Sequence, residues 1–202
     1  MKIVEIVDLI QRGDFPKSKD WEKACNDVNE AILCTDWPHG SGTFKIYPER
    51  KGNGVVPIKK PCIEKLKSLG WVTENLPPIG LLEGSKGKKP GDLDAIYHYP
   101  SGYVAFEWET GNISSSHRAI GKLLWTLKQG GIKGGFLVIP SNRLKIYLTD
   151  RIGNIGELRP YFDLWRDLNS QEAALRILVV EHDEESENVP KIPKGTDGRA
   201  KG

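Results

Sequence analysis

The segment Tyr103-Val104-Ala105-Phe106-Glu107-Trp108-Glu109 decides the fold of this 202-residue chain. Side chains of a β-strand alternate between its two faces. The apolar residues at the even positions therefore share one face, and Glu107 and Glu109 share the other. Two residues at this spacing lie roughly 6–7 Å apart along a strand. The segment predicts a strand with one apolar face and two neighbouring carboxylates on the opposite face.

A second strand is predicted just before it, over Leu93–Tyr99, and the connection Pro100-Ser101-Gly102 is a hairpin signal. A two-residue loop pairs Asp94 directly with Glu107, whereas a bulge at Gly102 shifts the pairing by one residue. Both registers bring Asp94 close to the two glutamates. The hairpin therefore predicts a cluster of three carboxylates.

Such a cluster needs something that offsets the mutual repulsion of its charges. Raised pKa values would remove charge by protonation, and a hard divalent cation would neutralise it by coordination. The alternative is that Glu107 and Glu109 are only the solvated face of an edge strand. A basic helix predicted directly after the strand favours the metal, because carboxylate-bound metal ions beside a cationic surface suit phosphodiester hydrolysis.

The rest of the chain alternates predicted helices and strands. Apolar spacing with start and stop signals predicts helices over Ile3–Ile10 (ended by Gly13), Lys19–Cys34, Pro61–Leu69, Ser114–Gln129 and Gly156–Leu168. Further strands are predicted over Thr43–Tyr47, Phe136–Ile139 and Leu175–Val180, and Leu76–Gly91 is predicted to be an exposed loop. Together these elements indicate an α/β fold with a mixed central β-sheet flanked by helices.

Composition indicates one domain with a short appendage. A chain of this length with 38% hydrophobic residues can bury its own core, which we place in residues 1–181. Residues 182–202 have almost no apolar content, so we expect a C-terminal arm that cannot fold alone. The net charge of +2 is too small to indicate a nucleic-acid partner by itself. However, residues 114–151 contain seven basic side chains and one acidic one. This balance is typical of either a surface that binds nucleic acid or an ordinary solvated surface.

The cysteines and the N-terminal residues bear on the cellular compartment. Cys25, Cys34 and Cys62 are odd in number and lack C-x-x-C spacing, so we expect small buried hydrophobes instead of disulfides or a zinc site. Glu5 and Asp8 interrupt the apolar start of the chain, which argues against a signal peptide. No apolar run has the length of a membrane span. We expect a cytoplasmic protein without a membrane partner.

Five blocks of sequence carry a resemblance to a known family. They are FEWETGNISSSHR (residues 106–118), NGVVPIK (53–59), YLTDR (147–151), ELRPYF (157–162) and NVPKIPKGTDG (188–198). In their order along the chain they closely resemble the BamHI family of type II restriction endonucleases. The resemblance implies the PD-(D/E)xK fold and Mg²⁺-dependent cleavage of double-stranded DNA at a palindromic site, GGATCC. It also implies a homodimer, no nucleotide cofactor, and a place in a restriction–modification system.

The resemblance also implies roles for the acidic residues. Asp94 and Glu107 match the metal-binding and catalytic acids of the family. Glu109 stands where the wider superfamily usually has lysine, and it would orient or deprotonate the attacking water. Glu74 matches a further metal-site acid, with a solvent-exposed acid at the end of a helix as the alternative.

The residues that would read DNA follow from the same blocks. Arg118 and Arg151 can each contact guanine N7 and O6 in the major groove, and the predicted helix that begins near Ser114 favours phosphate at its N-terminus. The other implied contacts are Asp150 on cytosine, Asn112 and Ser114 on the inner A·T pair, Lys59 on a nearby polar or water-mediated contact, and Gly195 and Asp197 in an arm that follows the minor groove. Taken singly, each is more often an ordinary surface residue.

The homodimer has a candidate surface on the helix after the catalytic strand. Ile120, Leu123, Leu124 and Leu127 form an apolar stripe, which plain core packing explains in part. The resemblance adds a subunit contact that uses this helix and the one predicted over Gly156–Leu168, with His117 structural or at that contact. A two-fold dimer matches a palindromic target.

Three other functions remain open on the residues alone. A sequence-specific DNA-binding module would need the arginines but not the carboxylates. A structure-directed repair nuclease would cut without reference to a six-base-pair site. A carbohydrate hydrolase can also use paired carboxylates, but it would not need Arg118 and Arg151.

Overall fold

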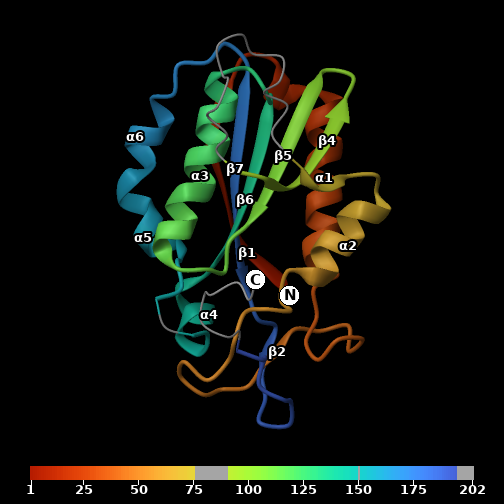
Figure 1. The fold of residues 1–202 in the computed structure, drawn as a ribbon, viewed down its shortest axis with the longest axis vertical. Helices are drawn as coiled ribbons and strands as arrows, with labels where there is room; N and C mark the ends of the chain where they lie inside the picture. Colours follow the sequence, from red (N-terminus) through yellow and green to blue (C-terminus); the bar gives the residue numbers. More distant parts are fainter. Residues whose placement is uncertain (76–90, 150, 195–202) are drawn as a thin grey trace.

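A six-stranded mixed β-sheet forms the centre of the computed structural model, which describes residues 1–75, 91–149 and 151–194 (Figure 1). In spatial order the strands are β1 (Lys2–Arg12), β7 (Ala173–Glu181), β6 (Gly134–Pro140), β5 (Gly102–Trp108), β4 (Leu93–Tyr99) and β3 (Val72–Asn75). Neighbours β5, β6 and β7 are parallel, and the other pairs are antiparallel. The predicted mixed sheet is confirmed.

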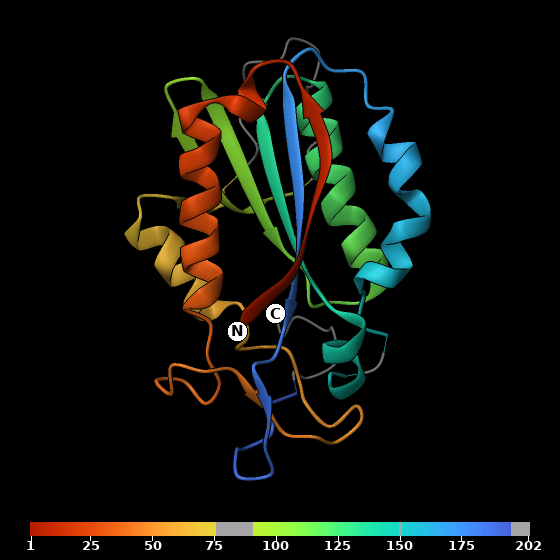
Figure 2. The same ribbon diagram turned by 180° about the vertical axis from the view of Figure 1, so that it is seen from behind.

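Helices cover both faces of this sheet, as Figures 1 and 2 show from opposite sides. One face is covered by α1 (Lys19–Leu33) and α2 (Lys60–Ser68), and the other by α3 (Ile113–Lys128), α5 (Ile155–Leu158) and α6 (Phe162–Arg166). The short elements are η1 (Phe15–Lys17), α4 (Asn142–Tyr147) and η3 (Arg159–Tyr161), together with the parallel pair β2 (Lys45–Ile46) and β8 (Glu184–Glu185). No helix among the described residues is long and apolar enough to cross a membrane.

Strand β5 joins the two hydrophobic cores. Val104, Phe106 and Trp108 pack into the core under α1 and α2, whereas Ala105 packs into the core under α3 and α6. The alternation predicted for this strand is therefore confirmed. Strand β5 lies between β4 and β6, so both of its edges are paired, and a hydrophobic core packs on each of its faces.

The helix predicted over Ile3–Ile10 is wrong, because this segment lies within the edge strand β1. Its apolar residues are mostly β-branched, and these favour strands. The pairing with β7 shifts register between Ile3 and Glu5 and again between Asp8 and Ile10. Each bulge adds one residue to the two-residue period. With two such bulges, the apolar residues of this strand stand at intervals that resemble those of a helix.

Other predicted elements differ in smaller ways. The helix predicted over Gly156–Leu168 is divided into α5, η3 and α6, and Pro160 lies in the first turn of η3. Helix α4 and strand β3 were not predicted, while α1, α2 and α3 match the prediction to within about one residue. The loop predicted over Leu76–Gly91 lies outside the described residues except for Gly91. All three cysteines are free, but Cys34 is exposed, so the prediction of three buried thiols is wrong for that residue.

The chain after β7 lies against the domain as far as Lys194. Strand β8 pairs with β2, and the Ile192 side chain is buried in the first core. Ile192 N donates to Asn53 Oδ1 at 3.2 Å, and Gly54 N donates to Ile192 O at 2.7 Å. The first part of the expected C-terminal arm is thus attached to the residue 53–54 loop.

Candidate active site and DNA-facing surface

The β4–β5 hairpin brings Asp94 to the catalytic strand. Tyr99 pairs with Gly102 and Ala95 with Phe106, without a register shift, so the connection has two residues and the alternative bulge is wrong. Continuing this register places Asp94 opposite Glu107. Asp94 Oδ2 accepts a hydrogen bond from Trp108 N at 2.8 Å, which holds the carboxylate at the end of β5.

Glu107 is a buried carboxylate on an interior strand. Its residue is 2% exposed, so the alternative of a solvated edge strand is wrong. Lys122 of α3 forms an ion pair with Glu107 Oε1, and Lys122 Nζ also donates to Asp92 O at 2.7 Å. Burial raises the pKa of Glu107 from 4.5 to about 7, against the lowering effect of Lys122 and with a further rise from the charges of Asp94 and Glu109.

Asp94 has a lysine of its own. Lys59 Nζ lies 2.7 Å from Asp94 Oδ1, and both side chains are partly exposed. Lys59 is the N-cap residue of α2, so the start of that helix is held against the hairpin. The structure therefore places Lys59 at the carboxylate cluster, where the sequence implied a contact near the bases.

Glu109 follows directly after β5 and is half-buried. Burial raises the pKa of its carboxyl group, the charge of Asp94 adds to this rise, and Lys122, Lys59 and Arg118 oppose it. A Cβ atom at Gly111 would lie 3.2 Å from Glu109 Oε2. The carboxylate thus lies beside the turn into α3, where a larger residue would crowd it.

The start of α3 joins this cluster to a second loop. Asn112 is the N-cap residue, and its Oδ1 accepts a hydrogen bond from Ser115 N at 3.0 Å. Asn112 also forms an isolated antiparallel bridge with Ile152, and Gly153 N donates to Gly111 O at 3.0 Å. The loop that contains Arg151 is therefore fixed to the beginning of α3.

Four of the expected DNA-contacting residues lie around this junction. Ser114 and Arg118 are exposed and, four residues apart, share one face of α3. Arg151 is exposed with φ +62°, and Asn112 is at the junction itself. Asp150, Gly195 and Asp197 lie outside the described residues.

Glu74 lies on β3, so its placement at the end of a helix is wrong. The neighbouring pairs Thr73–Ala95 and Asn75–Leu93 bring Glu74 to the level of Asp94 on the adjacent strand. Glu74 is exposed and has φ +52°. Within the described ranges, no three His, Cys, Asp or Glu side chains already stand in a metal-binding arrangement. The side chains available here, Glu74, Asp94, Glu107 and Glu109, nevertheless all offer carboxylate oxygens, the ligands that Mg²⁺ prefers.

The apolar stripe on α3 serves the core. Ile120, Leu123 and Leu127 are buried against the sheet, and only Leu124 remains partly exposed. Apolar groups that face outwards lie instead on η3 and α6: Tyr161 is 44% exposed and Leu164 is 70% exposed. The His117 ring contacts the Tyr161 ring edge-on at 4.7 Å between centroids. This group of residues defines an exposed patch between α3 and α6.

Lys122 is the functional residue that sequence analysis missed, since it was counted only as part of the basic surface. A signal was present: it lies four residues after Arg118, one helical turn further along the same face. What the sequence could not provide was the packing of α3 against β5, which turns this lysine towards Glu107.

Comparisons with known proteins agree on one family. The family model described as restriction endonuclease BamHI matches residues 1–199. The chain is 45% identical over 200 residues to the type II restriction enzyme OkrAI of Oceanobacter kriegii, covering 99% of each protein. It is 38% identical over 191 residues to the type II restriction enzyme BamHI of Bacillus amyloliquefaciens, covering 92% of this chain and 86% of that protein.

A solved structure supports the fold. The crystal structure of restriction endonuclease BglII complexed with a DNA 16-mer matches with a TM-score of 0.60 at 14% sequence identity. The match covers 91% of this chain and 79% of BglII. The chain therefore has the restriction-endonuclease fold that the sequence predicted.

Proposed function

The chain belongs to the BamHI family of type II restriction endonucleases, and on this premise we propose that it cuts both strands of duplex DNA at the palindrome GGATCC in a magnesium-dependent reaction. Its relatives are named type II restriction enzymes, so the chain is a site-specific deoxyribonuclease that hydrolyses phosphodiester bonds. The target sequence, the metal and the homodimer are the parts that we propose.

One observation carries the catalytic proposal: a buried glutamate, Glu107, lies on an interior strand beside two further carboxylates. Burial makes the ionised form of this carboxylate unfavourable, so its position is unlike that of a purely structural residue. Binding of a cation would explain why a carboxylate stands there. Asp94 and Glu107 would hold Mg²⁺, with Glu74 as the further acid on the neighbouring strand. When bound, the ion supplies an activated water and stabilises the leaving 3′ oxygen.

The proton of the attacking water goes to Glu109 in this proposal. The half-buried carboxylate adjoins the cluster, and its raised pKa suits a general base, which must accept a proton during the reaction. The water oxygen forms the new bond to phosphorus while the bond to the 3′ oxygen breaks. Lys59 keeps Asp94 in place and adds positive charge near the phosphate.

We assign recognition of the DNA base sequence to the junction between α3 and the loop that contains Arg151. Arg118 and Arg151 present guanidinium groups that suit guanine N7 and O6, and Asp150 would accept from cytosine N4. Asn112 and Ser114 are placed on the inner A·T pair. The arm formed by residues 182–202, with Gly195 and Asp197, would follow the minor groove.

A homodimer fits a palindromic target, because each subunit can cut one strand. We assign the subunit contact to the exposed patch between α3 and α6, where Tyr161 and Leu164 leave apolar surface in water. The enzyme would act in the cytoplasm, beside a methyltransferase that protects the host's own GGATCC sites. No nucleotide cofactor is required for this hydrolysis.

The test is cleavage of a plasmid with one GGATCC site, in Mg²⁺ and in Ca²⁺, followed by sequencing of the ends. The control plasmid differs by one base pair within the site, and the control protein is Glu107→Gln. Discrete cutting at the site in Mg²⁺, absent from both controls, supports the proposal. Binding without cutting in either metal would indicate a DNA-binding module, and diffuse cutting would refute the assigned base contacts.

A further inference from the structure

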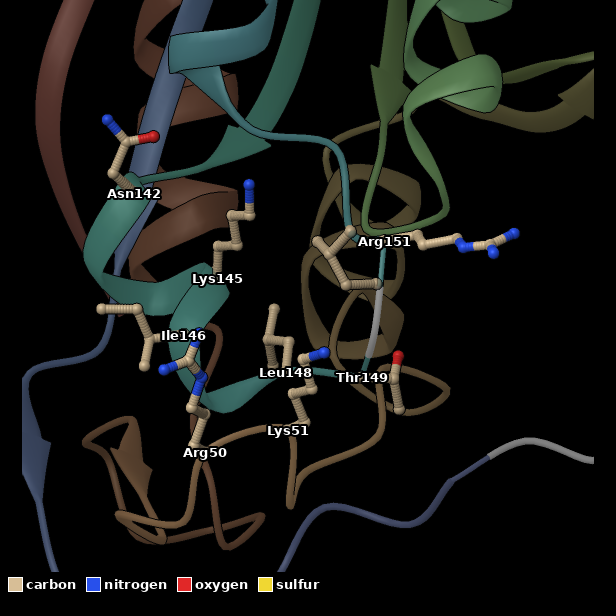
Figure 3. Close-up of a pocket in the computed structure, with 9 residues that line it drawn as sticks. Arg50, Lys51, Asn142, Lys145, Ile146, Leu148, Thr149 and Arg151 are labelled. Carbon is tan, nitrogen blue, oxygen red and sulfur yellow. The ribbon is translucent and has the colours of Figure 1, made fainter.

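A basic pocket of about 280 Å³ lies beside α4 (Figure 3), and its lining includes none of Asp94, Glu107 and Glu109. One wall is the loop with Arg50 and Lys51. The other comprises Asn142, Lys145 and Ile146 of α4 with Leu148, Thr149, Arg151 and Ile152. Four of its lining side chains are cationic: Arg50, Lys51, Lys145 and Arg151. None of the roles assigned above uses the first three.

Hydrogen bonds hold the two walls of the pocket together. Lys51 N donates to Ile146 O at 3.0 Å, and Asn53 N donates to Tyr147 O at 2.9 Å. The fully buried Asn53 side chain donates to the same Tyr147 carbonyl at 3.1 Å, and Asn53 forms a bridge with Leu148. The spacing of the cations is therefore set by the backbone before any ligand arrives.

Backbone strain concentrates at this pocket. Among the described residues, three that are not glycine have positive φ angles, and two of them, Lys51 at +56° and Arg151 at +62°, line it. Such conformations disfavour residues with a Cβ atom, and they persist only where the surrounding structure imposes them, often at ligand sites. Here both strained positions present a cationic side chain.

The charges of Lys145 and Arg50 are at most partly neutralised by the described residues. Lys145 Nζ lies 3.2 Å from Glu157 Oε1, but both side chains are well exposed, and such a pair is weak and exchangeable. Across the described ranges of the chain, Arg50 forms no ion pair. The pocket can therefore offer positive charge to an anion from solution.

The pocket lies next to a residue that is proposed to contact DNA. Arg151 belongs both to the pocket and to the loop that is bridged to the start of α3 through Ile152 and Asn112. In Figure 3 the Arg151 side chain extends away from Lys145 and Asn142, so it can reach a base while Arg50 and Lys145 stay with the pocket. DNA whose base is read by Arg151 would bring its backbone near them.

We propose that this pocket binds a backbone phosphate of the DNA strand that flanks the base pair read by Arg151, with Arg50 and Lys145 as its principal contacts. The inference rests on the proposed function and adds to it a contact that carries no sequence information. Such contacts position a protein on DNA, and they make up half or more of the hydrogen bonds in protein–DNA interfaces.

The test is the salt dependence of DNA binding by the double variant Arg50→Gln/Lys145→Gln, with Ca²⁺ in place of Mg²⁺. Each lost phosphate contact lowers the slope of log affinity against log salt concentration by about one. For a dimer with two pockets we expect a decrease of about two, so that the affinity deficit shrinks roughly tenfold between about 50 and about 200 mM salt. The deficit should be equal on GGATCC duplex and on a duplex without the site.

The matched control is Lys19→Gln, which removes an exposed charge at the start of α1, at the opposite end of the molecule from α4 (Figure 2). This variant should keep the wild-type slope. A scan of single methylphosphonate substitutions in the flanking backbone should find one position that weakens the wild type but not the double variant. Circular dichroism spectra and melting curves of both variants should match the wild type.

An unchanged slope in the double variant, or no such position in the scan, would overturn the phosphate pocket. Calorimetric binding of inorganic phosphate that needs Arg50 and Lys145, with an unchanged slope on DNA, would identify a site for a free anion and overturn the DNA assignment. If the wild type shows no preference for GGATCC, the proposed function fails, and the slope on the other duplex still decides about the pocket.

Discussion

Replacing Glu107 with glutamine should make the metal-free protein more stable and inactive at the same time. Glutamine keeps the size and the hydrogen-bond acceptor of the side chain but cannot ionise. Burial raises the pKa of Glu107 from 4.5 to about 7, although Lys122 opposes this. The folded protein therefore destabilises its own carboxylate, and the variant removes that cost.

The size of the effect follows from the pKa. Below about pH 4.5 the carboxyl group is protonated in both the folded and the unfolded chain, so the substitution changes little. Between 4.5 and about 7 the unfolded chain loses its proton first, which costs the wild type stability as the pH rises. At about 1.4 kcal/mol for each pKa unit, the full cost above pH 7 is about 3 kcal/mol. This corresponds to a rise in melting temperature of about 6–12 °C for a chain of this length.

The assay is thermal unfolding in EDTA at pH 5 and pH 8, at one protein concentration. Glu107→Gln should melt well above the wild type at pH 8 and close to it at pH 5. Glu64→Gln, at an exposed position on α2, is the control and should follow the wild type at both values. Added Ca²⁺ should raise the melting temperature of the wild type but not of Glu107→Gln. If the variant melts below the wild type by the same amount at both pH values, the electrostatic argument is refuted.

Three further substitutions test other parts of the site. Lys122→Met removes the cation that lowers the pKa of Glu107, so that pKa should rise and the pH profile of cleavage should shift to more alkaline values; an unshifted profile would contradict this. Leu164→Asp should convert the proposed dimer to monomer in analytical ultracentrifugation, whereas Leu33→Asp, at a similarly exposed position on α1, should leave it intact. Arg118→Lys should lose about 1–3 kcal/mol of discrimination against a changed guanine, measured as the ratio of specific to mismatched binding, because lysine cannot form the two-pronged contact.

The parts of the fold that could be predicted from the sequence have local signals. The hairpin followed from alternation on β5 and the Pro100-Ser101-Gly102 signal, although its register stayed open between direct pairing and a bulge until the structure decided it. Helix α3 followed from its apolar stripe and the glycines that end it. The edge strand β1 could not be recognised, because its two bulges depend on pairing with β7, some 170 residues later in the chain. Pro160 did offer a local signal for the break between α5 and α6, and the apolar spacing on either side masked it.

The sequence predicted that the three acidic residues of the candidate site lie close together, but not which lysines pair with them. Asp94, Glu107 and Glu109 come from one hairpin, so their proximity is a local property. Lys59 reaches Asp94 across 35 residues, and Lys122 reaches Glu107 only because α3 folds back over the sheet. Ion pairs of this kind depend on tertiary packing, which no pattern in a single sequence specifies.

The order of residues after β5 places the proposed base-reading residues close to the proposed catalytic carboxylate. Only two residues separate Glu109 from Asn112, the N-cap residue of α3, and Arg118 lies within two turns of it. The same turn carries the Arg151 loop through the Asn112–Ile152 bridge and the bond from Gly153 N to Gly111 O. A Cβ atom at Gly153 would lie 2.2 Å from Ser116 Oγ, so the two segments are closely packed at this point. If a wrong base displaced the backbone of either segment, the start of α3 would move with it, together with the carboxylate that is proposed to accept the proton.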